Sequence, residues 1–190
     1  MTGYPIPATR LIPAAKPPIA QNQQETPLVD RVSASIVIGG ALGAEAFLEL
    51  AGVIADEGLA TEWDGEPFDP EHRTAGEPLR LYAHEVAWGR FERLEAWCVE
   101  HALPFARWSG AYSGQWGAER VVFTGSGEPT SYAVDEDDDV VIGREAVQRL
   151  GSIEAVIAQF DAADFEVPQL TIGDEDSRLA APLNDEKLRA

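Results

Sequence analysis

The sequence contains few of the residues on which common catalytic sites and small scaffolds depend. It has one cysteine, Cys98, three histidines, and only two lysines, Lys16 and Lys187. A single cysteine excludes an internal disulfide and is typical of a reducing compartment, so we expect a cytoplasmic protein. Because both lysines lie near the ends of the chain, a Schiff-base lysine in the folded part is excluded.

Long apolar runs are also missing. No stretch approaches the roughly 18–20 consecutive apolar residues of a membrane-spanning helix, so no membrane association is expected. The first 20 residues lack the unbroken apolar segment of a secretory leader, and none is predicted there. Neither a Gly-x-Ser-x-Gly elbow nor a phosphate-binding loop occurs, so the common serine-hydrolase and nucleotide-binding signatures are absent.

The remaining composition is that of a folded chain. Of 190 residues, 45% are hydrophobic and 25% are charged, which suits one globular domain. Six of the 13 prolines lie before residue 31, without any apolar period. We therefore predict a flexible proline-rich arm over residues 1–30, one globular domain over residues 31–167, and a flexible tail over residues 168–190.

Acidic side chains dominate the charge. The chain carries 33 Asp and Glu residues against 14 Lys and Arg, for a formal net charge of −19. Residues 128–176 hold 14 of these carboxylates and only two basic side chains, Arg144 and Arg149. Such a field repels nucleic acid and anionic lipid and attracts basic proteins, although acidic residues also serve solubility alone. We therefore exclude direct nucleic-acid binding and expect a basic protein partner, with the oligomeric state left open.

Hydrophobic periodicity predicts an α+β fold. The order strand, helix, strand, strand, helix, strand describes a split-βαβ, ferredoxin-like antiparallel sheet with two packing helices, followed by a C-terminal β-hairpin and a helical extension. Ser152 is a predicted N-cap of the last helix. The predicted strands span residues 33–38, 59–63, 79–86, 105–112, 119–124, 131–134 and 140–142, and the predicted helices span 44–57, 90–102 and a region from 144 to about 160.

The run Asp135-Glu136-Asp137-Asp138-Asp139 is the most acidic segment. It does not fit a calcium-binding EF-hand loop, because Val140 stands where that loop needs glycine. We expect it at the tip of a hairpin, either as hydrated surface or as part of a partner-binding patch. The candidate partner-binding acids are Asp135, Glu136, Asp137, Asp138, Asp139, Asp161, Asp164 and Glu166.

Metal and cofactor sites have little support. Cys98 and His101 are three residues apart on a predicted helix, and His84 on the preceding strand completes a conceivable zinc set. A lone Cys-x-x-His is a weak signal, and a buried cysteine beside a surface histidine explains it. We expect no cofactor and no metal. The pair His84 and Glu85 is the first place to look for acid–base chemistry.

Aromatic residues concentrate between residues 82 and 116, where four of the five tryptophans lie. Trp97 falls off the apolar stripe of its predicted helix, and Trp116 lies in a glycine-flanked loop. We interpret both as anchors of a protein interface, with core packing as the alternative.

Together these features favour a non-catalytic, acidic, protein-binding inhibitor. Its carboxylates would mimic nucleic acid and occupy a basic groove on a nucleic-acid-handling protein, and in composition and size the chain resembles antirestriction and anti-CRISPR inhibitors. Two alternatives remain open: an immunity or antitoxin-like partner of a basic toxin, and a small enzyme with a site at His84 and Glu85.

Overall fold

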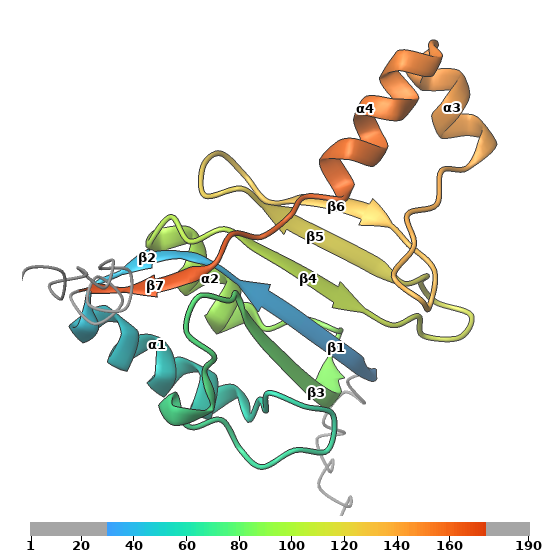
Figure 1. The fold of residues 1–190 in the computed structure, drawn as a ribbon. Helices are drawn as coiled ribbons and strands as arrows, with labels where there is room; N and C mark the ends of the chain where they lie inside the picture. The colour runs from blue at the N-terminus through green and yellow to red at the C-terminus, as the bar shows by residue number, and fades with distance from the viewer. Residues whose placement is uncertain (1–29, 174–190) are drawn as a thin grey trace, which may run out of the picture.

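The computed structural model describes residues 30–173, so the predicted proline-rich arm lies outside the described residues except for its last residue. A five-stranded antiparallel sheet with the strand order β3-β1-β4-β5-β6 forms its centre (Figure 1). The fold is therefore mixed α+β, as the sequence predicts. The strands are β1 (Arg31–Ile38), β3 (Leu79–Ala87), β4 (Phe105–Ser109), β5 (Glu119–Phe123) and β6 (Thr130–Ala133).

Two helices cover one face of this sheet. Helices α1 (Ala44–Glu57) and α2 (Glu92–Glu100) bury Leu50 and Ile54, and Leu94 and Cys98, against the sheet. Each pair is four residues apart, so both side chains lie on one side of their helix. This contact forms the main hydrophobic core of the molecule.

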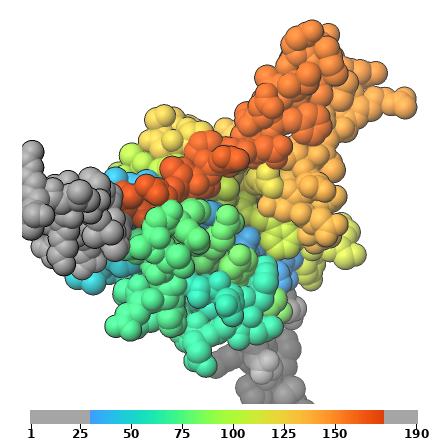
Figure 2. Space-filling model, in the orientation of Figure 1, coloured from blue at the N-terminus to red at the C-terminus, as the bar shows by residue number. Residues whose placement is uncertain are grey.

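A second pair of helices lies at the β6 edge of the sheet. Helices α3 (Arg144–Leu150) and α4 (Ile153–Ala163) project from the β6 side, as both views of the molecule show (Figures 1 and 2). Ser152 caps α4 by accepting a hydrogen bond from the Ala155 N–H at 3.1 Å, as predicted. Each helix between residues 30 and 173 is too short or too polar to cross a lipid bilayer.

Adjacent side chains of β5 pack into two different hydrophobic clusters. Val121 and Phe123 belong to the main core, whereas Val122 packs with Tyr132 and Ala163 in a small cluster below α4. Successive side chains of a strand point to opposite faces, which explains the division. The end of α4 is thereby fixed to the face of the sheet that α1 and α2 leave open.

A short parallel ladder joins distant parts of the chain. Strand β2 (Gly40–Leu42) pairs with β7 (Leu170–Ile172), and Leu170 is completely buried. The two segments of the chain approach closely here: a Cβ on Gly39 would lie 1.9 Å from the carbonyl oxygen of Pro168. The tail predicted from residue 168 thus begins with an ordered strand. Its remaining part, from residue 174, lies outside the described residues.

The connections differ from the prediction in two places. Residues 59–63 make only two isolated bridges, from Ala60 to Pro67 and to Tyr82, because the Gly65 N–H bonds the Glu62 carbonyl and turns the chain back. Residues 131–134 and 140–142 are joined by the bridge between Val134 and Val140 and by the hydrogen bond from the Val141 N–H to the Ala133 carbonyl, whereas β6 forms a full ladder with β5. A single-turn helix, η1 (Pro70–His72), lies in the loop that leads to β3.

The burial of Leu170 makes β7 a structural requirement. We expect Leu170→Ala to lower the free energy of unfolding by about 3 kcal/mol, the usual range for a leucine removed from a packed core. Its neighbour Gln169 is exposed, so Gln169→Ala should change the value by less than about 0.5 kcal/mol. Urea denaturation measures both, and equal small effects would show that β7 is not part of the core.

Candidate functional site

One end of the sheet brings together the chemically versatile side chains. Trp88 directly follows β3, Ser109 ends β4 and Glu119 begins β5. Antiparallel neighbours place these strand ends side by side, with Ser109 opposite Glu119 in the register. The loop over residues 110–118, between β4 and β5, closes this end.

A buried arginine lies beneath it. Arg107 is only 2% exposed, and its guanidinium donates hydrogen bonds to the Gly89 carbonyl at 2.9 Å, to Ser109 Oγ at 2.9 Å and to Glu119 Oε1 at 2.6 Å. Its Nε also lies 3.1 Å from Glu95 Oε1. That last contact is an ion pair without hydrogen-bond geometry, because Nε has no hydrogen-bond partner among the described residues. One cation therefore joins β4, β5, α2 and the turn after β3.

Burial raises the pKa of Glu95. Loss of water outweighs the opposing effects of the Arg107 charge and of the hydrogen bond from the Phe91 N–H at 3.0 Å. The direction follows from the general cost of ionising a carboxyl group away from water. The Glu95 carboxyl group thus takes up a proton more readily than an exposed glutamate.

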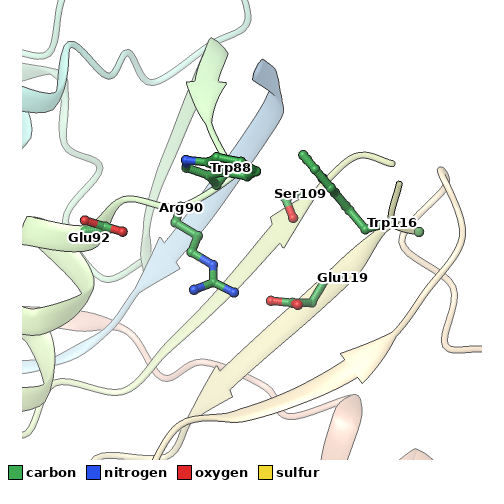
Figure 3. Close-up of a pocket in the computed structure, with 7 residues that line it drawn as sticks. Trp88, Arg90, Glu92, Ser109, Trp116 and Glu119 are labelled. Carbon is green, nitrogen blue, oxygen red and sulfur yellow. The ribbon is translucent and has the colours of Figure 1, made fainter. Parts of the chain in front are cut away.

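Above this network lies a cavity of about 360 Å³. It is lined by aromatic, basic, acidic and hydroxyl side chains together, which Figure 3 shows in close-up. Arg90 extends into it with its guanidinium toward Glu119. The lining residues are Trp88, Arg90, Glu92, Ser109, Trp116, Gly117 and Glu119.

Trp88 and Trp116 form an aromatic wall of the cavity, and Tyr112 packs against this wall without lining the cavity. The rings of Trp88 and Trp116 have centroids 5.6 Å apart, and Tyr112 stacks on Trp116 at 5.0 Å. Asp30 holds two of these residues. Its carbonyl accepts a hydrogen bond from the backbone N–H of Trp88 at 2.9 Å, and its carboxylate accepts one from the Tyr112 hydroxyl group. That hydrogen bond and the charge of Asp30 raise the pKa of the Tyr112 hydroxyl group.

The backbone at the cavity is held in an unfavourable conformation. Trp88 has φ 56°, in the left-handed region that costs a residue with a Cβ about 1 kcal/mol or more. Gly89 follows with φ 64°, and a Cβ there would lie 2.5 Å from the Cβ of Ser109. Strained backbone of this kind is concentrated at functional sites in proteins.

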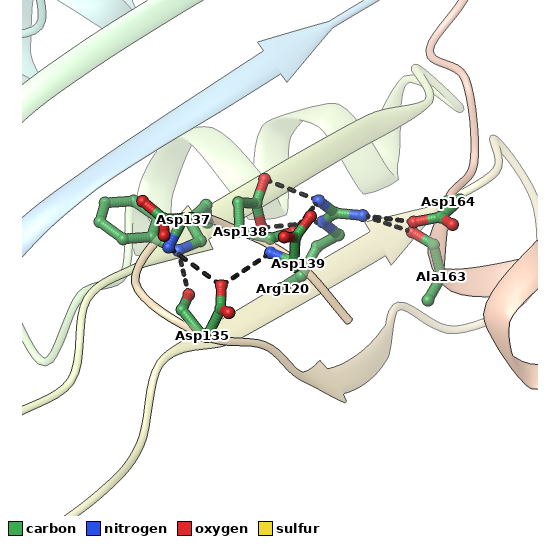
Figure 4. A network of polar contacts seen from close by, with 8 residues as sticks. Arg120, Asp135, Asp137, Asp138, Asp139, Ala163 and Asp164 are labelled. Carbon is green, nitrogen blue, oxygen red and sulfur yellow. Dashed lines mark hydrogen bonds and ion pairs between the residues drawn. The ribbon is translucent and has the colours of Figure 1, made fainter. Parts of the chain in front are cut away.

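The acidic run forms a tight turn between β6 and residue 140 (Figure 4). Asp135 Oδ1 accepts hydrogen bonds from the N–H groups of Asp137 and Asp139, each at 3.0 Å. Asp138 binds Arg120 through both carboxylate oxygens, at 2.9 and 2.8 Å. The side chains of Asp137 and Asp139 remain exposed.

The other candidate acids divide between paired and free positions. Asp164 binds Arg120 at 3.0 Å, and Glu136 accepts the Ala111 N–H at 3.1 Å. Asp161 and Glu166 are exposed on and after α4. The Arg120 pKa is raised, since its hydrogen bonds to Asp138 and Asp164 outweigh burial, so the guanidinium stays charged and joins the acidic turn to α4.

The two candidate tryptophans lie in different surroundings. Trp116 lines the cavity. Trp97 is half-buried, packs against the main core and stacks on His101 at 3.8 Å. Cys98, next in the chain, is buried, and this raises its thiol pKa to about 12, so it stays protonated.

The alternative enzyme site at His84 and Glu85 has only some of the contacts that acid–base chemistry needs. His84 Nδ1 lies 2.8 Å from Ser33 Oγ, and its Nε2 lies 3.5 Å from Asp64 Oδ1. The chain bulges here, with Glu85 at φ 56°. However, the His84 and Asp64 side chains are 46% and 86% exposed, and neither His84 nor Glu85 lines the cavity described above. Water would therefore compete for each contact of His84.

Comparisons with known proteins found no relative. No protein-family model matches the chain, and neither the curated proteins nor the solved structures include a similar one. Within residues 30–173, no group of three or more His, Cys, Asp and Glu side chains is arranged to hold a metal ion.

The sequence did not single out Trp88, Arg90, Arg107 or Glu119. A signal for Arg107 was present, because alternation along β4 places it on the same face as the buried Phe105. An arginine at a core-facing position needs a carboxylate partner. The identity of that partner, Glu119, depends on strand register, which the sequence does not reveal.

Replacing the buried Arg107 should destabilise the protein strongly. We expect Arg107→Met to lower the free energy of unfolding by about 3 kcal/mol or more, because Glu95 and Glu119 then lack their shared counter-charge. Arg80→Met, on the exposed side of β3, is the matched control and should cost less than about 0.5 kcal/mol. Chemical denaturation measures the stability of both variants. Equal stability of the two would contradict the structural role of Arg107.

The raised pKa of Glu95 also predicts a pH dependence. Above the ordinary carboxyl value near 4.5, the unfolded chain loses the Glu95 proton while the folded chain still holds it. The contribution of Glu95 to stability therefore falls as pH rises from that value through the raised pKa. We expect the unfolding free energy of Glu95→Gln, relative to the original protein, to increase over this window. Urea denaturation from pH 4 to 7 tests it, and parallel curves would refute the shift.

Proposed function

We propose that this protein is a non-catalytic acidic binder that occupies a basic groove on a nucleic-acid-handling protein, as nucleic acid itself would. The observation that carries the proposal is the acidic turn over residues 135–139 and its attachment to α4. Its carboxylates are numerous, and their backbone is held by Asp135 and by Arg120. A cytoplasmic site of action, inferred from the single cysteine, belongs to the same proposal.

Fixed exposed charges are what a nucleic-acid mimic needs. Asp137 and Asp139 project from a turn whose backbone is already hydrogen bonded, so binding would order little additional chain. Asp138 and Asp164 contribute less, because Arg120 already neutralises them. We therefore assign the main contact to Asp137 and Asp139, with Asp161 and Glu166 beside them.

The helical projection supports a protein as the partner. Ile153 and Ile157, four residues apart on α4, are 65% and 52% exposed, and Val141, before α3, and Val147, on α3, are also exposed. Exposed aliphatic side chains on a strongly acidic surface suit a protein interface better than a solvated face. A cleft of about 280 Å³ lies between β6 and the helices, lined in part by Tyr132, Val141 and Ala146.

We keep the ferredoxin-like description as a proposal for part of the fold. Strands β3 and β4 are both antiparallel to β1, lie on either side of it and are joined by α2, which is one split-βαβ unit. The second unit of that fold would need a full strand at residues 59–63.

The test replaces the two exposed carboxylates. Immobilised full-length protein is exposed to host lysate, and the retained proteins are eluted with duplex DNA and then with high salt. We expect basic nucleic-acid-binding proteins in the DNA eluate, and about tenfold weaker retention by Asp137→Asn/Asp139→Asn, since interfacial charges contribute of that order. Quantitative mass spectrometry measures the ratio.

The matched control removes the same charge elsewhere. Glu66 and Glu71 are exposed in the loop before β3, and Glu66→Gln/Glu71→Gln should leave retention unchanged. If both variants lose retention equally, only net charge matters, and the assigned surface is wrong. A basic partner that high salt releases and DNA does not would instead favour the immunity or antitoxin-like alternative.

A further inference from the structure

The cavity above Arg107 contains opposite charges that face one another without pairing. Arg90 extends toward Glu119 from the α2 side, and Glu92 lies at the start of that helix (Figure 3). Within residues 30–173 Arg90 makes no ion pair and no side-chain hydrogen bond, although an acceptor of the opposite charge stands across the cavity. A ligand group that binds both side chains would complete the pairing of these charges.

Glu119 is already fixed for such a role. Its Oε1 receives the 2.6 Å hydrogen bond from buried Arg107, whereas Oε2 has no hydrogen bond within the described part of the chain. A carboxylate held by one oxygen presents the other in a set direction, so little ordering is lost when a donor binds.

The aromatic wall supplies the apolar contact. Trp88 remains 49% exposed beside Trp116, even though its left-handed backbone costs stability. Glycine would adopt that φ without strain, so the backbone conformation gives no reason for tryptophan at this position. Contact with a ligand does give one, because an indole provides a large rigid surface.

The charges narrow the class of ligand. A purely cationic ligand would meet Arg90, and a purely anionic ligand would meet Glu92 and Glu119. A molecule with both an ammonium and a carboxylate satisfies the two sides, since arginine binds carboxylates through paired hydrogen bonds. The volume of about 360 Å³ is near the lower end for ligand pockets, which suits a small molecule.

We propose that this cavity binds a free α-amino acid with an apolar side chain. The carboxylate of the ligand binds Arg90, its ammonium binds Glu119, and its side chain packs on Trp88 and Trp116. This site does not depend on the proposed binding of a basic protein. Amino-acid titration and partner retention are measured separately, so either proposal can fail alone.

The test uses the full-length protein and tryptophan fluorescence. Each apolar L-amino acid is titrated to millimolar concentration, and the tightest one is compared with its amide and with its N-acetyl derivative. The amide lacks the carboxylate and the N-acetyl derivative lacks the ammonium, so we expect each to bind about tenfold or more weakly. Absence of saturable binding by every amino acid, or an amide that binds as tightly as the acid, overturns the proposal.

Two variants locate the site. Arg90→Gln should lose the preference for the acid over the amide, whereas Arg80→Gln, a control on the exposed side of β3, should keep it. Trp88→Gly should weaken binding at least tenfold while the protein keeps its stability in urea, because glycine relieves the strain at φ 56°. If Arg90→Gln and Arg80→Gln bind alike, the amino acid does not bind in this cavity.

Discussion

The fold depends on the burial of one charge. Arg107 lies on the core side of β4, where an isolated guanidinium would be very unfavourable. Its partners come from four separate segments, so β4, β5, α2 and the turn at Gly89 must all be in place together. Hydrophobic packing alone is not directional, whereas this network requires one arrangement of the sheet end.

A second arginine also joins separate segments of the chain, on the opposite face of the sheet. Arg120, next to Val121 in β5, binds the acidic turn and the end of α4. Because neighbouring residues of a strand face opposite ways, a chain with few basic side chains uses two of them to order both faces of one sheet end. Asp137 and Asp139, by contrast, are exposed and make no ion pair within residues 30–173, so their charges add to the negative field of the surface.

Local patterns predicted much of the fold and little of the cavity. The periodicity of Leu50 and Ile54 identified α1 at its observed bounds, and the β-branched run before Gly39 identified β1. Strand β7 was missed because three residues are too few to show alternation, and its burial depends on a partner 130 residues away. Arg90 and Glu119 face each other only through strand pairing and the turn after Trp88, which no local pattern contains.

The parallel pairing of β2 with β7 has a consequence for synthesis of the protein. The ribosome makes β2 early, and Leu170, which fills the core beside it, emerges only after every other element described here. Until then the chain carries an incomplete hydrophobic core, and closing so long a loop is slow. The core beside β2 is therefore completed late, when the last strand of the described part of the chain meets one of the first.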